Sequence, residues 1–155
     1  MDEGTFSVLD AALRARCWDI RRVRDRIEER RRTFDQSVAA EVDSMGYQLH
    51  NFYGAFEQLF DEVARFFENR IDDARYHADL IRRMRLEIRG IRPALLSDAT
   101  AAELDELRRF RQLFRHAYST DLDPDKVAGL ADKAPGICRA FEQDFEIFQT
   151  RLRPA

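Results

Sequence analysis

The stretch that decides the fold is residues 38–66, VAAEVDSMGYQLHNFYGAFEQLFDEVARF. Its apolar residues follow alternating steps of four and three without a break: Val38, Val42, Met45, Leu49, Phe52, Phe56, Leu59, Val63 and Phe66. This spacing places all of these side chains on one stripe of a helix, as in the seam of a coiled coil. The stretch therefore predicts one long helix that packs this stripe against neighbouring helices.

Two glycines, Gly46 and Gly54, lie inside this pattern. Glycine in a helix interior weakens the helix relative to alanine. A residue without a Cβ also lets another helix come close, which would suit a dimer interface. The sequence leaves both interpretations open.

An amphipathic helix is also predicted before this stretch, from about Thr5 to about Arg31. Its apolar residues recur at steps of three and four: Phe6, Leu9, Leu13, Cys17, Ile20, Val23 and Ile27. Its many arginines have acidic neighbours at i,i+4 and are expected to form a solvated face. An RNA path or a partner contact along this face is the alternative.

The segments after residue 66 predict three further helices. A break near residues 69–73 precedes a helix from about Ala74 to Gly90, with Tyr76, Leu80, Met84 and Ile88 on one face. A fourth helix follows and is described below. Asp123 and Pro124 are typical of an N-cap followed by proline at the first helical position, and Pro135 is expected to split this last helix in two.

Composition agrees with an all-α fold. Hydrophobic residues make up 45% of the 155 residues, charged residues 35%, and there are only 6 Gly and 4 Pro. Long amphipathic helices have this profile, whereas disordered chains and turn-rich β-folds do not. We expect a single domain over residues 1–155, folded as an up-and-down bundle of about five helices.

Several functional classes receive no support from the sequence. The formal net charge is −3, so no global charge attracts nucleic acid. The two cysteines, Cys17 and Cys138, have no CxxC or Cys/His spacing, and neither a disulfide framework nor a zinc site is indicated. Residues 1–10 lack the basic and apolar pattern of a signal peptide, and no apolar run has the length of a membrane span. We therefore expect a cytoplasmic protein without membrane, metal or cofactor.

The fourth helix carries the residues with chemical potential, and Ser97 or Thr100 is expected to cap it. Phe110 lies at the centre of its apolar face, which the pattern predicts to be buried: Leu104, Leu107, Phe110, Leu113, Phe114 and Ala117. At about 100° per residue, Arg108, Gln112 and Arg115 point outward from this face. The arginines are expected to form a solvated basic face or to help hold RNA.

Two arginines, a histidine and a tyrosine lie on the two shoulders of this face, which are the helix surfaces on either side of it. Arg111 and Tyr118 share one shoulder, and Arg109 and His116 share the other, about 140° away. A straight helix therefore keeps Arg111 and His116 apart. Two copies meeting around a dyad would line one cleft with both residues, and a helix that unwinds before Tyr118 would swing His116 round instead.

The motif Arg111-x4-His116-Ala117-Tyr118 resembles the RX4HXY motif of HepT toxins in the HEPN superfamily. The resemblance extends to the surrounding residues 107–123, to Asn51-Phe52-Tyr53-Gly54 and to the last helix. It covers most of the chain after about residue 45, and residues 1–32 are less diagnostic. It implies an all-α HEPN-like bundle that dimerises with both motifs facing a shared cleft.

The resemblance also implies an activity, metal-independent RNA cleavage by an endoribonuclease. Arg111 would bind the scissile phosphate, and His116 would act as general base or acid for attack by the 2′-hydroxyl. A partner nucleotidyltransferase antitoxin of the MNT type would adenylylate Tyr118 and inactivate the toxin. This chain departs from the family at Gln112, where many members carry Asn, Asp or His.

Two other interpretations remain open. One is a non-catalytic HEPN-type module that binds RNA, nucleotide or a partner protein, and the other is a plain coiled-coil interaction protein. His50 and His77 are more typical of packing or capping positions, with a secondary place in the cleft as the alternative.

Overall fold

The structure is a computed structural model that describes residues 1–68, 76–116 and 121–154. Within these ranges the chain forms five α-helices and no β-strand. The helices are α1 (Glu3–Arg31), α2 (Ala39–Glu68), α3 (Tyr76–Met84), α4 (Asp98–Arg115) and α5 (Pro124–Leu152). The all-α class predicted from the sequence is confirmed.

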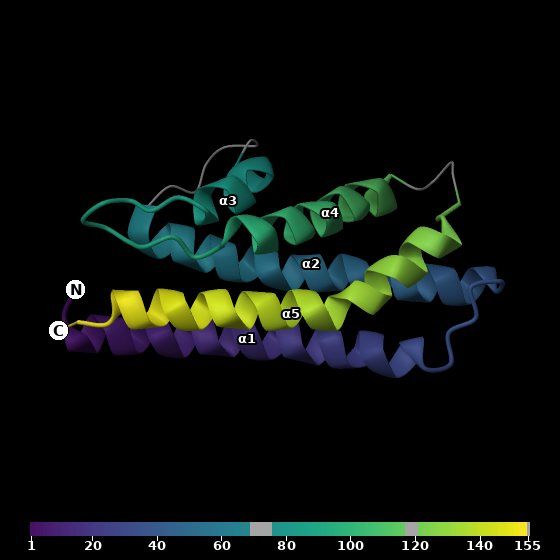
Figure 1. The fold of residues 1–155 in the computed structure, drawn as a ribbon, viewed down its shortest axis with the longest axis horizontal. Coiled ribbons are helices and arrows are strands. Elements are labelled where there is room, and N and C mark those ends of the chain that lie inside the picture. The colour runs from purple at the N-terminus through teal and green to yellow at the C-terminus, as the bar shows by residue number, and fades with distance from the viewer. Residues whose placement is uncertain (69–75, 117–120, 155) are drawn as a thin grey trace.

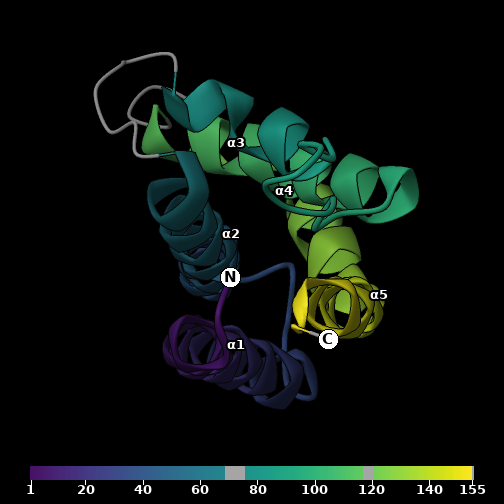
Figure 2. The same cartoon turned by 90° about the vertical axis from the view of Figure 1, so that its left-hand side faces the viewer.

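The four long helices run alternately up and down, and both termini lie at the same end of the bundle (Figure 1). Seen from that end, α1, α2, α4 and α5 surround the core (Figure 2). The short α3 packs against α2 and α4. The predicted up-and-down bundle of five helices is therefore confirmed.

The ends of three helices are fixed by acidic or hydroxyl caps. Asp2 accepts a hydrogen bond of 2.8 Å from the Thr5 amide, so α1 begins two residues earlier than predicted. Ser97 accepts from the Thr100 amide at the start of α4, and Asp123 caps α5 with proline at the first position. Each cap satisfies an amide that the helix itself leaves unpaired.

The apolar stripe of α2 forms the centre of the core. Most of it is buried, including Phe52, Phe56 and Leu59, which are fully inaccessible. The prediction is wrong at its two ends: Val38 is 43% exposed and Phe66 is 41% exposed. Val38 precedes the helix and Phe66 lies in its last turn, so both stand where the neighbouring helices no longer cover the stripe.

The prediction that the third helix reaches Gly90 is wrong, because α3 ends at Met84. The Met84 carbonyl accepts from the amides of two residues that follow the turn, at 2.8 and 3.0 Å. Gly90, at φ 75°, turns the chain so that Arg92 enters the interior. Arg92 there bonds Glu68 at 2.7 Å, with its side chain fully buried. The break expected at residues 69–73 lies outside the described residues.

The expected split of the last helix at Pro135 is also wrong. α5 continues through this proline and changes direction along its length (Figure 1). Proline removes one amide donor and crowds the preceding turn, which bends a helix without ending it when packing holds both halves.

None of the helices in the described part of the chain has the length and apolar character that a membrane span requires.

Candidate active site

Arg111 projects from α4 toward α2. Its Nη1 nitrogen donates to both carboxylate oxygens of Glu57, each at 2.8 Å. The side chains are 23% and 15% exposed, so this ion pair is partly buried. The guanidinium also stands 5.7 Å from the centroid of the Tyr53 ring. Charge pairing and a cation–π contact together hold this arginine in one place.

The residues of α2 that face α4 form a second stripe, Gly46, His50, Tyr53 and Glu57, at steps of four, three and four. A Cβ at Gly46 would lie 2.6 Å from a Leu122 methyl carbon and 3.3 Å from the Phe114 ring. The close approach that the sequence suggested for this glycine is therefore made within the chain. A Cβ at Gly54, by contrast, would meet no atom of the described residues within 4 Å.

Three polar atoms in this region are buried without a hydrogen-bond partner among the described residues: His50 Nδ1, Tyr53 Oη and Arg111 Nε. The ring of His50 packs against Phe114, with centroids 5.3 Å apart. Buried polar atoms without partners cost free energy and are uncommon in folded proteins. Three such atoms lie together around Arg111, where α2 contacts α4. This contact is therefore a candidate for a functional role as well as a structural one.

The electrostatic environment keeps His50 and Tyr53 neutral. Burial lowers the pKa of His50, and the cations Arg111 and Arg115 lower it further, against an opposing effect of Glu57. Burial also raises the pKa of Tyr53, and the nearby Glu57 carboxylate adds to this. At neutral pH the imidazole is therefore held in its neutral form, and the phenol keeps its proton.

His116 follows the last residue of α4 and is exposed. It is the C-cap, at φ −109° and ψ 11°, and its amide donates to the Leu113 and Phe114 carbonyls. The described contacts of Arg111 are to α2, and none is to His116. Tyr118 and Ala117 lie outside the described residues.

A family model described as HepT-like protein matches residues 44–152. The chain belongs to this HepT-like family. The match runs from α2 to the end of α5, so it includes Glu57, Arg111 and His116 and leaves α1 outside. The resemblance that the motif suggested is thereby confirmed at the level of the family. Searches of curated proteins and of solved structures find no match.

The other candidate residues of the HepT-like chain lie around the same helix. Arg108 and Arg109 both pair with Asp105, at 2.8 Å. Arg108 is less exposed than predicted, because its side chain is 22% exposed and lies along α4 to pair with Asp105. Gln112 and Arg115 are exposed.

The prediction that Leu113 is buried is also wrong, because this side chain is 49% exposed. Phe114, the next residue, packs over Gly46. One residue of a helix is a rotation of about 100°, so Leu113 is turned away from this contact and toward the surface. The apolar pattern of α4 is therefore wider than the face that the bundle buries.

Arg111 has two partners on α2 that the sequence did not predict, Tyr53 and Glu57. A signal for them exists, because residues 46, 50, 53 and 57 form a polar or small stripe beside the heptad seam of the same helix. Such a stripe indicates a face that contacts another helix through polar groups. Its partner helix could not be identified from spacing alone.

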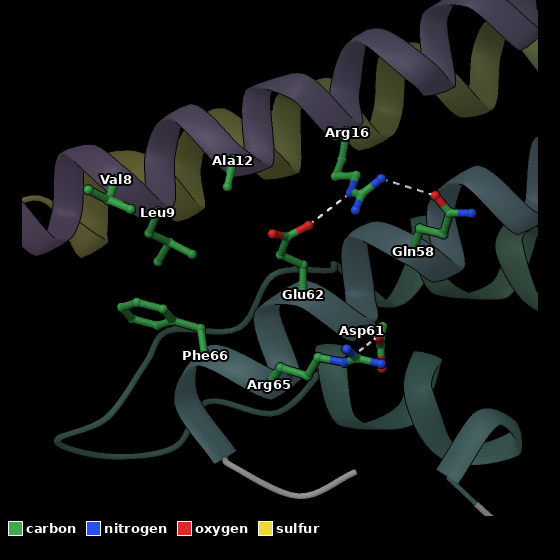
Figure 3. Close-up of a pocket in the computed structure, with 9 residues that line it drawn as sticks. All are labelled: Val8, Leu9, Ala12, Arg16, Gln58, Asp61, Glu62, Arg65 and Phe66. Atoms are coloured by element: carbon green, nitrogen blue, oxygen red, sulfur yellow. Dashed lines mark hydrogen bonds and ion pairs between the residues drawn. The ribbon is translucent and has the colours of Figure 1, made fainter.

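The described residues around Arg111 include no cluster of metal ligands. No group of three or more His, Cys, Asp and Glu residues that could hold a metal ion occurs in the described part of the chain. A groove of about 540 Å³ lies between α1 and α2, where Arg16 pairs with Glu62 at 2.8 Å (Figure 3). Its lining includes none of the motif residues.

Proposed function

We propose that this HepT-like protein is the toxin of a toxin–antitoxin pair and acts as a metal-independent endoribonuclease. Arg111 binds the scissile phosphate, and His116 transfers a proton during attack by the neighbouring 2′-hydroxyl. The observation that carries the proposal is the partly exposed side chain of Arg111, held by Glu57, with an exposed His116 at the end of the same helix. Both residues lie in the part of the chain that matches the family.

The active site is proposed to be composite, built by two copies of the chain. Arg111 is directed at α2, whereas His116 is exposed at the helix end, so one copy is poorly arranged to present both groups to one phosphate. Exposed apolar side chains are available for contact with a second copy, Leu113 at 49% and Tyr47 at 54%. A homodimer would bring Arg111 of one chain to His116 of the other.

The remaining motif residues have supporting roles in this proposal. Tyr118 is the site at which a nucleotidyltransferase antitoxin of the MNT type adds AMP, which would put bulk and negative charge two residues from His116. The exposed Arg109, Arg115 and Gln112 are candidates for contacts with the RNA backbone, and the half-buried Arg108 is a weaker one.

A second candidate function is an RNA-binding or protein-binding HEPN-type module without cleavage. The specific observation in favour of a module without cleavage is the Glu57–Arg111 ion pair, because the carboxylate occupies the arginine that would otherwise hold the scissile phosphate. The formal net charge of −3 acts in the same direction.

Expression of the chain without its antitoxin tests the first proposal. The wild type should arrest growth, and the purified protein should cleave RNA in the presence of EDTA. Arg111→Ala and His116→Ala should abolish both effects. Arg139→Ala, which removes an exposed arginine of α5 outside the motif, should abolish neither.

Two results would count against it. Equal toxicity of all variants would exclude a role for the motif, and RNA that is shifted by the protein but stays intact would favour the binding module. Intact-mass analysis after co-expression with the antitoxin tests the modification, which Tyr118→Phe should prevent.

A further inference from the structure

The pairing between Glu57 and Arg111 is unusual in its geometry. Both carboxylate oxygens bond the same nitrogen, Nη1, at 2.8 Å each. The Nε nitrogen is buried and has no described partner. This leaves Nη2 as the nitrogen with which a phosphate oxygen could form a direct hydrogen bond.

The ring of Tyr53 supports the guanidinium from α2. The side chain of Tyr53 is fully buried, and the Arg111 guanidinium carbon is 5.7 Å from its ring centroid. A guanidinium whose Nη1 is held by a carboxylate and whose carbon lies over an aromatic ring has little freedom to rotate. Tyr53 and Glu57 occupy successive turns of one helix, so α2 alone fixes both constraints.

The charge of Glu57 has the opposite sign to that expected of a group that attracts RNA. A carboxylate beside the arginine repels a phosphate, and partial burial of the pair limits screening by salt. Glu57 therefore weakens the electrostatic attraction of RNA while it restricts the position of Arg111. Its contribution to catalysis would lie in orientation rather than in binding.

We propose that Glu57 is a positioning residue, which holds the Arg111 guanidinium on the Tyr53 ring so that one nitrogen is directed at the scissile phosphate. This inference rests on the proposed ribonuclease function. It assigns to α2 the part of the active site that the motif on α4 lacks, a group that fixes the arginine before RNA binds.

The test compares Glu57→Gln with Asp61→Asn. Asp61 is one turn further along α2, and it pairs with Arg65 at 2.6 Å on the surface, so this control removes the same charge from the same helix. Glu57→Gln should lower kcat by roughly 10-fold to 100-fold, the range expected when a reacting group is misplaced. KM for RNA should stay unchanged or fall, and Asp61→Asn should alter neither constant.

A second measurement does not depend on activity. The Nε–H signal of Arg111 in a ¹⁵N NMR spectrum, assigned by its loss in Arg111→Lys, should exchange slowly with solvent in the wild type because this nitrogen is buried. Glu57→Gln should accelerate this exchange, and Asp61→Asn should not. If the wild type cleaves no RNA, the proposed function fails, while the exchange data still decide whether Glu57 holds Arg111.

Three outcomes would overturn the inference. An unchanged kcat with unchanged exchange would make the pair a structural contact only, and a higher kcat in Glu57→Gln would make Glu57 inhibitory. A rise in KM without a fall in kcat would place Glu57 in RNA binding. If Glu57→Gln does not fold, Glu57→Asp, which keeps the charge and shortens the reach, should show the same two effects to a smaller extent.

Discussion

The two glycines of α2 offer a matched pair of substitutions with different expected effects. Gly46→Ala places a methyl group 2.6 Å from a Leu122 methyl carbon and 3.3 Å from the Phe114 ring. Gly54→Ala places the same group where no atom of the residues that the structure describes lies within 4 Å. Both residues lie in the interior of one helix, so the gain in helix propensity is similar and the difference reports packing.

The magnitudes follow from two opposing effects. Replacing a helical glycine by alanine stabilises a helix by roughly 1 kcal/mol. Gly54→Ala should therefore raise Tm by about 2–4 °C, as expected for a domain of about this size. At Gly46 the same gain is offset by an overpacking cost of roughly 1–3 kcal/mol, since Leu122 and Phe114 must move. The two variants should thus differ by about 1–3 kcal/mol.

Urea unfolding of both variants and the wild type, at two protein concentrations, measures these differences. Stabilisation of Gly46→Ala by as much as Gly54→Ala would refute the packing argument. A Gly54→Ala variant that loses stability only at the concentration where the protein dimerises would show instead that a second copy packs against Gly54.

Two further predictions concern charge inside the fold. Glu68→Ala leaves the fully buried side chain of Arg92 without its carboxylate and should lower the free energy of unfolding by about 3 kcal/mol or more. Arg85→Ala breaks a more exposed ion pair, with Asp98, and should lower it by less than about 1 kcal/mol. Equal losses in the two variants, measured by urea unfolding, would contradict the argument. The lowered pKa of His50 means that the unfolded chain binds its proton more tightly, so stability should fall as pH drops below about 6.5. His50→Gln should remove this contribution, which urea unfolding at pH 7.5 and pH 5 would reveal as a smaller pH dependence than in the wild type.

The fold could be predicted largely because its signals are local. The spacing of the α2 stripe and the caps of α4 and α5 act within a few residues. The stripe was found where the sequence placed it except at Val38 and Phe66, Asp123 caps α5 as predicted, and Ser97 is the one of two predicted candidates that caps α4. The end of α3 could not be predicted in this way. It depends on Arg92 reaching Glu68, a contact between segments that are 24 residues apart.

The candidate site was predictable only in part for the same reason. The motif predicted Arg111 and His116 as site residues, and the helical periodicity predicted that their side chains lie on different sides of α4. The pairing of Arg111 with Glu57 spans 54 residues and depends on how α4 lies against α2. That register is set by contacts such as Phe114 over Gly46, which no spacing within one helix encodes.

The most direct test of a shared, metal-independent site is complementation between two inactive variants. Arg111→Ala and His116→Ala should each fail to cleave RNA in EDTA, and neither should recover when refolded alone. Refolded together in equal amounts, half of the dimers would be mixed and would hold one intact site of two, so about a quarter of wild-type activity should return. A mixture as inactive as its components, beside an active wild type, would contradict the shared site.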